Sequence, residues 1–175
     1  MIGFRHADPR HPFLWEGRDQ PAARWHDEGD GPVHYFSDTP DGAWAEFLRH
    51  EEITDPEDVA TIQRDLWAVD LGEPQFAEPG LPRETLTGGY ASYPACRAEA
   101  SRLRRLGTDG LEAPSAALLP GAARGWRVDG GLQPGEPRDG TVYVLFGRRP
   151  DLIGWRATAA GRPDQGLLAV VRRLD

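Results

Sequence analysis

Lysine and asparagine are absent from this chain of 175 residues, and Cys96 is its only cysteine. Without lysine the chain carries neither the lysine of a Walker-type phosphate loop nor a Schiff-base lysine. Any anionic ligand must therefore be held by arginine, backbone N–H groups or hydroxyls. A lone cysteine cannot form an internal disulfide, which is typical of proteins in a reducing compartment, so we expect a cytoplasmic protein.

Long hydrophobic runs are also missing. The longest, Thr141–Phe146 and Leu167–Val171, are far too short to cross a bilayer, and residues 1–6 lack the apolar core of a signal peptide. The net charge is −8, from 28 acidic and 20 basic residues, which disfavours nonspecific binding to DNA, RNA or anionic lipid. We therefore expect neither membrane insertion nor direct nucleic-acid binding, while a local basic pocket for a small anion remains compatible with this charge.

Metal and nucleophile signatures are missing as well. The chain contains no HExxH, CxxC or GxSxG motif, and its histidines are scattered: His6, His11, His26, His34 and His50. Cys96 falls on the apolar face of an expected helix with Ala100 and Leu103, where a thiol stays unreactive. We predict no metal site and a packing role for Cys96.

The hydrophobic pattern predicts a single α+β domain over residues 1–175, with strands towards both ends and helices in the middle. The expected strands are Ile2–Arg5, Val33–Ser37, Leu66–Leu71, Leu111–Pro114, Thr141–Phe146, Ile153–Thr158 and Leu167–Arg172. The expected helices run from Thr39 to about Glu51, from Asp55 to about Arg64 and over Ser92–Leu106. Stretches 73–82 and 121–139 are expected to be loops because they are rich in proline and in acidic residues or glycine.

One helix carries the most interesting carboxylate. Thr39 and Pro40 form a good helix start, because threonine can cap free N–H groups and proline suits the first turn. Glu46 falls just outside the apolar arc of that helix, where a carboxylate can be half-buried in a cleft wall and still reach a ligand. On composition alone, however, a solvated glutamate on a helix flank is the more common outcome.

A resemblance to the RES family, named for arginine, glutamate and serine, favours the first interpretation. Arg24, Tyr35 and Glu46 are equally spaced, and Ser115 follows later, as in that family. Arg5 resembles a further family arginine, and the similarity runs from about residue 4 to residue 117. The segments that carry it are Ala23-Arg24-Trp25, Val33-His34-Tyr35-Phe36-Ser37, Ala43-Trp44-Ala45-Glu46 and Glu112-Ala113-Pro114-Ser115-Ala116.

The resemblance implies a fold related to ADP-ribosyltransferases, with a mixed or antiparallel sheet core and flanking helices. It implies cleavage of NAD+, either by phosphorolysis with inorganic phosphate as co-substrate or by hydrolysis, and no metal. Many such proteins are bacterial toxins that are neutralised by an antitoxin with a DNA-binding helix-turn-helix domain. We therefore expect an antitoxin partner, while the oligomeric state, a homo-oligomer included, stays open.

The residues suit this chemistry. Loss of nicotinamide leaves positive charge on the ribose, which a fixed carboxylate stabilises, and Glu46 is our candidate. Arg24 and Arg5 offer fork-shaped donors to the diphosphate. Tyr35 is expected to pack against the nicotinamide end, and Ser115 to donate to a phosphate or ribose oxygen.

The chain also departs from the family pattern. The family often reads Gly-Gly-Arg-Trp-Asn, whereas this chain has Ala22-Ala23-Arg24-Trp25-His26, and a later family asparagine is missing too. If those amides contact substrate, either His26 compensates for their loss or the affinity for substrate and the choice of substrate have changed. Three alternatives therefore stay open: a catalytically silent NAD+-binding domain, an ADP-ribosyltransferase acting on a protein or small molecule, and an interaction domain without a nucleotide site.

Overall fold

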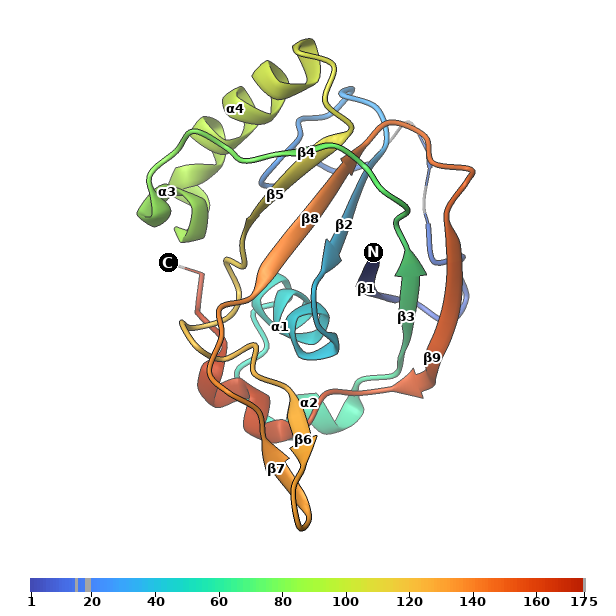
Figure 1. The fold of residues 1–175 in the computed structure, drawn as a ribbon, viewed down its shortest axis with the longest axis vertical. Helices are drawn as coiled ribbons and strands as arrows, with labels where there is room; N and C mark the ends of the chain where they lie inside the picture. Colours follow the sequence, from blue (N-terminus) through green and yellow to red (C-terminus); the bar gives the residue numbers. More distant parts are fainter. Residues whose placement is uncertain (15, 18–19, 175) are drawn as a thin grey trace.

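A seven-stranded mixed sheet forms the centre of the computed structural model, which describes residues 1–14, 16–17 and 20–174 (Figure 1). Its strand order is β4-β5-β8-β2-β1-β3-β9, in which β4 and β5 are parallel and all other neighbours are antiparallel. The strands are β1 (Ile2–Ala7), β2 (Val33–Ser37), β3 (Arg64–Asp70), β4 (Phe76–Ala77), β5 (Gly110–Pro114), β8 (Thr141–Phe146) and β9 (Ile153–Gly161).

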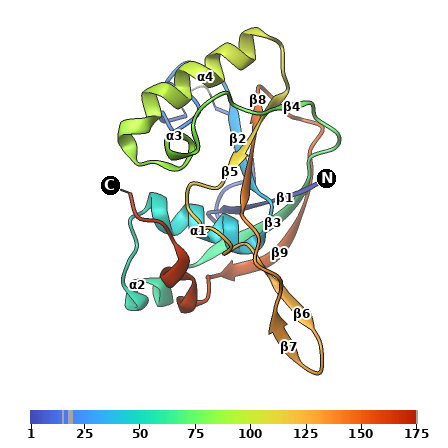
Figure 2. The ribbon, with the colours of Figure 1, turned by 60° about the vertical axis from the view of Figure 1, so that its left-hand side comes forward.

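The helices are short and lie mostly on one side of this sheet, as the turned view shows (Figure 2). They are α1 (Pro40–His50), α2 (Pro56–Thr61), α3 (Arg83–Thr87), α4 (Tyr93–Arg105) and the 3₁₀ helices η1 (Tyr90–Ser92) and η2 (Gln165–Val170). A separate hairpin, β6 (Trp126–Val128) and β7 (Leu132–Pro134), projects away from the sheet.

Local sequence signals set where the two longest helices begin and end. The Thr39 side chain accepts a hydrogen bond from the Gly42 N–H at 3.0 Å, which satisfies a free donor at the start of α1. Gly107, with φ of 78°, follows the end of α4 in a left-handed conformation that glycine adopts without strain.

The two faces of the sheet bury different clusters. Strand β1 turns Phe4 and His6 towards α1: Phe4 packs against the cluster that contains Trp44 and Phe47, and the His6 ring contacts both of these rings. Side chains alternate along a strand, so Arg5 lies on the opposite face. That opposite face holds Phe36, Val69, Leu71 and Leu145, with Phe13 and Leu14 packed against them.

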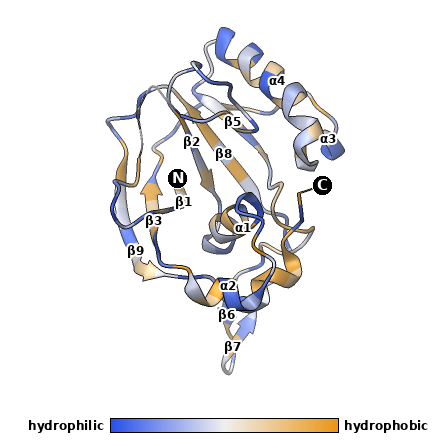
Figure 3. Cartoon of the chain, turned by 180° about the vertical axis from the view of Figure 1, so that it is seen from behind, coloured by the Kyte–Doolittle hydropathy of each residue, from blue (hydrophilic) through white to orange (hydrophobic). Residues whose placement is uncertain are grey.

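A second cluster lies beneath α4. It contains Cys96, Ala100 and Leu103 from the helix, which pack with Trp25 and with residues of β2, β5 and β8. Figure 3 shows mainly hydrophobic residues along β8, whereas α4 alternates between hydrophilic and hydrophobic residues. Helices α1 and α4 thus pack into separate clusters, and the candidate site lies between α1 and the end of β5.

The α+β class with a mixed sheet and flanking helices is confirmed. The predicted strand Leu167–Arg172 is wrong, because Gln165–Val170 forms η2, whose first turn is capped by Asp164 through the Gly166 N–H at 2.8 Å. Leu167 from this helix packs into the α1 cluster.

Other boundaries moved. Helix α2 ends at Thr61 and strand β3 begins at Arg64, so the predicted helix to Arg64 was too long. The expected loops contain β4 and the β6–β7 hairpin, and α3 was not predicted. Within the described part of the chain, no helix has both the length and the apolar character needed to span a membrane.

Candidate active site

Glu46 and Ser115 meet between α1 and the end of β5. The Ser115 hydroxyl donates to Glu46 Oε1 at 3.0 Å, and Glu46 is half-buried while Ser115 is 5% exposed. Ser115 Oγ in turn accepts from the backbone N–H groups of Ala117 and Leu118, each at 3.2 Å. Because a hydroxyl has one proton and both its acceptor positions are engaged, that proton is directed at the carboxylate. The arrangement fixes an acceptor carboxylate, as a charge-stabilising group requires.

Close backbone approaches hold these two elements in place. A Cβ at Gly42 would lie 2.9 Å from the Ser37 Cβ, so a glycine lets the first turn of α1 pack onto the end of β2. The Ser115 N–H donates to the Gly140 carbonyl at 2.8 Å, which ties the turn after β5 to the start of β8. Glu46 and Ser115 therefore depend on β2, β8 and β5 lying in that order.

Arg24 packs against α3, η1 and the start of α4. Its Nη2 donates to the Gly88 carbonyl at 2.6 Å and its Nη1 to Ser92 Oγ at 2.9 Å, while the guanidinium lies 4.7 Å from the centre of the Tyr93 ring. Only 8% of Arg24 is exposed. These contacts orient the fork but leave it without an ion-paired carboxylate among the residues that the structure describes.

A second arginine, Arg49, which the sequence analysis missed, links α1 to the carbonyl that Arg24 contacts. Arg49 follows Glu46 by three residues on α1, a spacing that places both on one side of the helix. Its Nη2 donates to the same Gly88 carbonyl at 2.8 Å. The pKa of Arg49 is lowered by burial and by the charge of Arg24, and Glu46 acts in the opposite direction. Glu46, Arg49 and Arg24 therefore form one electrostatic group.

Tyr35 and His26 hold the backbone next to Arg24 in place. The Tyr35 hydroxyl accepts from the Trp25 N–H at 3.1 Å and contacts His26 Nδ1 at 2.9 Å. His26 is 3% exposed, and burial lowers its pKa, which disfavours the charged form of the ring. Burial also raises the pKa of Tyr35. The polar tips of both side chains thus orient the bend that carries Arg24.

Arg5 is not brought to this group. It lies on the other face of the sheet, with its guanidinium 5.5 Å from the centre of the Phe36 ring. Burial, followed by repulsion from Arg64, lowers its pKa to about 10. The alternation along β1 therefore separates Arg5 from Glu46, although the sequence pattern had grouped them.

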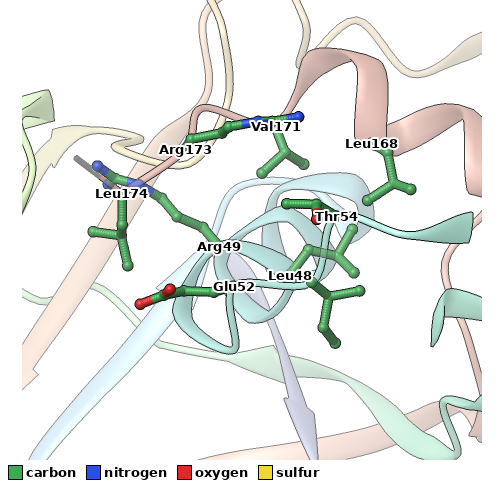
Figure 4. Close-up of a pocket in the computed structure, with 9 residues that line it drawn as sticks. Leu48, Arg49, Glu52, Thr54, Leu168, Val171, Arg173 and Leu174 are labelled. Atoms are coloured by element: carbon green, nitrogen blue, oxygen red, sulfur yellow. The ribbon is translucent and has the colours of Figure 1, made fainter.

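A hollow of about 310 Å³ opens beside the end of α1, with Arg49 in its wall (Figure 4). Its lining combines aliphatic side chains with charged ones: Leu48, Arg49, Glu52, Ile53, Thr54, Leu168, Val171, Arg173 and Leu174. In size it falls in the range of small-molecule pockets. Among the described residues, no group of three or more histidine, cysteine, aspartate or glutamate side chains is placed to hold a metal ion.

The fold is similar to that of a solved structure. A chain of the crystal structure of the M. tuberculosis MbcT–MbcA toxin–antitoxin complex superposes with a TM-score of 0.62 at 17% identity, covering 96% of this chain and 86% of that one. The likeness shows a shared α+β fold.

The sequence itself gives the family. It matches the RES domain over residues 3–164, which spans β1 to the end of β9, and the chain therefore belongs to the RES domain family. The resemblance noted in the sequence is thereby confirmed. No curated protein matches the sequence.

Proposed function

We propose that this chain cleaves NAD+ at the bond between nicotinamide and ribose, as a bacterial toxin of the RES family. The observation that supports this most directly is the Glu46 carboxylate, half-buried and held by the Ser115 hydroxyl at 3.0 Å. Membership of the RES family and the likeness to a chain of a toxin–antitoxin complex support the same class of activity.

The chemistry follows from the charge that develops on the sugar. As the C1′–N bond breaks, its electron pair leaves with nicotinamide, and the ribose ring becomes positively charged. A fixed anion next to the ring stabilises that charge more in the transition state than in the substrate, which accelerates the reaction. Glu46 supplies the anion, Ser115 positions it, and Arg24 binds a phosphate oxygen of the dinucleotide.

An acceptor then attacks C1′. An oxygen of inorganic phosphate forms the new C1′–O bond in phosphorolysis, whereas water does so in hydrolysis and releases a proton. Both routes use the same carboxylate, so the co-substrate is decided by measurement. Tyr35 and His26 serve in this proposal by orienting the segment that carries Arg24, because their polar atoms contact each other and the Trp25 N–H.

The likeness to a toxin–antitoxin complex also supports an antitoxin partner, which we propose carries a helix-turn-helix domain and restrains the enzyme in the cytoplasm. Co-expression with the gene next to its own, followed by copurification, tests for this partner. A chain that cleaves NAD+ in cells without harm and copurifies with nothing would contradict a toxin–antitoxin role.

The activity itself is tested by following nicotinamide release from NAD+ by the purified chain, with and without inorganic phosphate. Glu46→Gln keeps the shape of the side chain but removes its charge, and we expect release to fall by about 100-fold or more. Glu73→Gln is the matched control, because Glu73 is exposed in the connection between β3 and β4.

The outcomes separate the candidates. Loss of release in Glu46→Gln alone supports the proposal, and dependence on phosphate identifies phosphorolysis. Binding of NAD+ by the folded wild-type chain without any release would overturn it in favour of a silent binding domain. Transfer of ADP-ribose to an added acceptor, in place of phosphate or water, would show a transferase.

A further inference from the structure

Arg24 and Arg49 reach the same backbone carbonyl from different parts of the fold. Gly88 O accepts from Arg24 Nη2 at 2.6 Å and from Arg49 Nη2 at 2.8 Å, so the two nitrogens lie within two hydrogen-bond lengths of each other. Arg24 comes from the segment before β2, and Arg49 from the last turn of α1. Two guanidinium groups that are far apart in sequence are thus held together.

This pair is buried and forms no ion pair in the part of the chain that the structure describes. Arg24 is 8% exposed and Arg49 5% exposed, and none of the ion pairs of the described chain includes either one. Elsewhere, buried Asp65 has Arg156 as its partner at 3.1 Å. Two like charges that are held close and removed from water repel each other, and an anion bound between them relieves that repulsion.

Arg49 also has donor capacity to spare. Among the described residues, its buried Nε has no hydrogen-bond partner, while its Nη2 donates to the carbonyls of Gly88 at 2.8 Å and Thr87 at 3.5 Å. A third arginine, Arg172, lies close enough to lower the pKa of Arg49 further. Unused N–H donors beside concentrated positive charge are what oxyanions bind, and the fork of arginine suits phosphate in particular.

We propose that Arg49 is a phosphate-binding residue of the active site, acting with Arg24 one helical turn from Glu46. The inference rests on the proposed NAD+ cleavage for the identity of the ligand. The shared chemistry is a phosphate oxygen, which comes either from the diphosphate of NAD+ or from inorganic phosphate as the attacking group. Arg49 also borders the hollow at the end of α1, which leaves room for the rest of a ligand beside it (Figure 4).

A purely structural role for Arg49 would be to clamp the Gly88 carbonyl. Such a clamp affects stability but gives no specific response to phosphate, so binding separates the two roles. Arg49→Met keeps much of the aliphatic stem and removes the charge. Arg49→Lys keeps the charge but loses the fork. Arg105→Met is the matched control, because Arg105 is an exposed residue of α4.

The experiment measures binding of two probes to each folded variant by calorimetry at constant ionic strength: ADP-ribose, which carries the diphosphate but no nicotinamide, and inorganic phosphate alone. We expect Arg49→Met to lose about tenfold or more in affinity for at least one probe and Arg105→Met to match wild type. Loss for ADP-ribose assigns Arg49 to the diphosphate, with a rise in KM for NAD+ and little change in kcat. Loss for inorganic phosphate alone assigns it to the co-substrate.

Wild-type affinity of Arg49→Met for both probes would overturn the proposal. If Arg49→Met does not fold, Arg49→Lys decides: weaker binding by about threefold or more supports the site, and unchanged binding refutes it. Because binding needs no turnover, the two proposals fail separately. An inactive chain whose Arg49 variant loses ADP-ribose binding refutes cleavage alone, and an active chain with an unaffected Arg49 variant refutes the arginine pair alone.

Discussion

Replacement of Ser115 by alanine tests the candidate site most directly, because one hydroxyl serves both the carboxylate and the backbone. A hydrogen bond to a charged group contributes about 1.5–3 kcal/mol, and each 1.36 kcal/mol corresponds to about tenfold in rate. If the Ser115 bond holds Glu46 where ribose charge develops, Ser115→Ala should lower kcat by about 10- to 150-fold.

Stability should fall as well. The Ala117 and Leu118 N–H groups lose their acceptor, and an unsatisfied buried donor costs about 1–3 kcal/mol. Because the small side chain leaves space that water can enter, we expect the free energy of unfolding to drop by about 2–4 kcal/mol in total. Urea unfolding and nicotinamide release are measured under the same buffer conditions, so that kcat refers to the folded fraction.

The control is Ser101→Ala, since Ser101 lies on α4 and its hydroxyl accepts a hydrogen bond from Arg105 Nη1 at 3.0 Å. Ser101→Ala should leave kcat unchanged and should change the free energy of unfolding by no more than a few tenths of a kcal/mol, roughly the usual range for such sites. A Ser115→Ala chain that is destabilised but keeps wild-type kcat would refute the positioning of Glu46 by Ser115. Unchanged stability would refute the account of the two backbone donors.

Three further predictions concern the rest of the fold. Burial and then the Arg5 charge lower the pKa of His34 to about 4. Below about pH 6.5 His34 is therefore protonated in the unfolded chain but stays neutral in the folded chain until about pH 4. The free energy of unfolding, measured in urea, should fall by about 3 kcal/mol between pH 6.5 and 4, and His34→Gln should reduce this fall. Burial raises the pKa of the Cys96 thiol, so a disulfide reagent should label it in urea but hardly in the native protein, and fast native labelling would contradict its packing. Ala160 has φ of 47°, so Ala160→Gly should raise the free energy of unfolding by up to about 1 kcal/mol, and a loss of stability would count against strain there.

The sequence predicted the parts of the fold that depend on local signals. The Thr39 cap and the proline after it start α1 as expected, and Gly107 ends α4. The apolar run 167–171 was misread as a strand because a short apolar run does not by itself distinguish a strand from a helix, and the Asp164 cap favours a helix. Hairpins such as β6–β7, with three residues in each strand, are too short to leave a clear alternation.

The candidate site was predicted only in part, for a similar reason. The resemblance grouped Glu46 with Ser115, and the structure places them in hydrogen-bond contact. Because side chains alternate along a strand, Arg5 and Phe4 lie on opposite faces of the sheet. The sequence around β1 does not indicate which of these faces α1 covers. Arg49 escaped notice because its partner Gly88 lies in a stretch without helical period, and only the folded sheet brings that carbonyl to α1.

The position of β8 between β2 and β5 sets the order in which the site can be completed during synthesis. Glu46 follows β2 and Ser115 follows β5, whereas β8, the strand between β2 and β5, is synthesised after both, over Thr141–Phe146. A nascent chain that has emerged only as far as Ser115 holds both residues but not the strand that aligns them. Glu46 and Ser115 can therefore be aligned only after residue 146 has left the ribosome, so cleavage of NAD+ under the proposed function has to wait for that stage of synthesis.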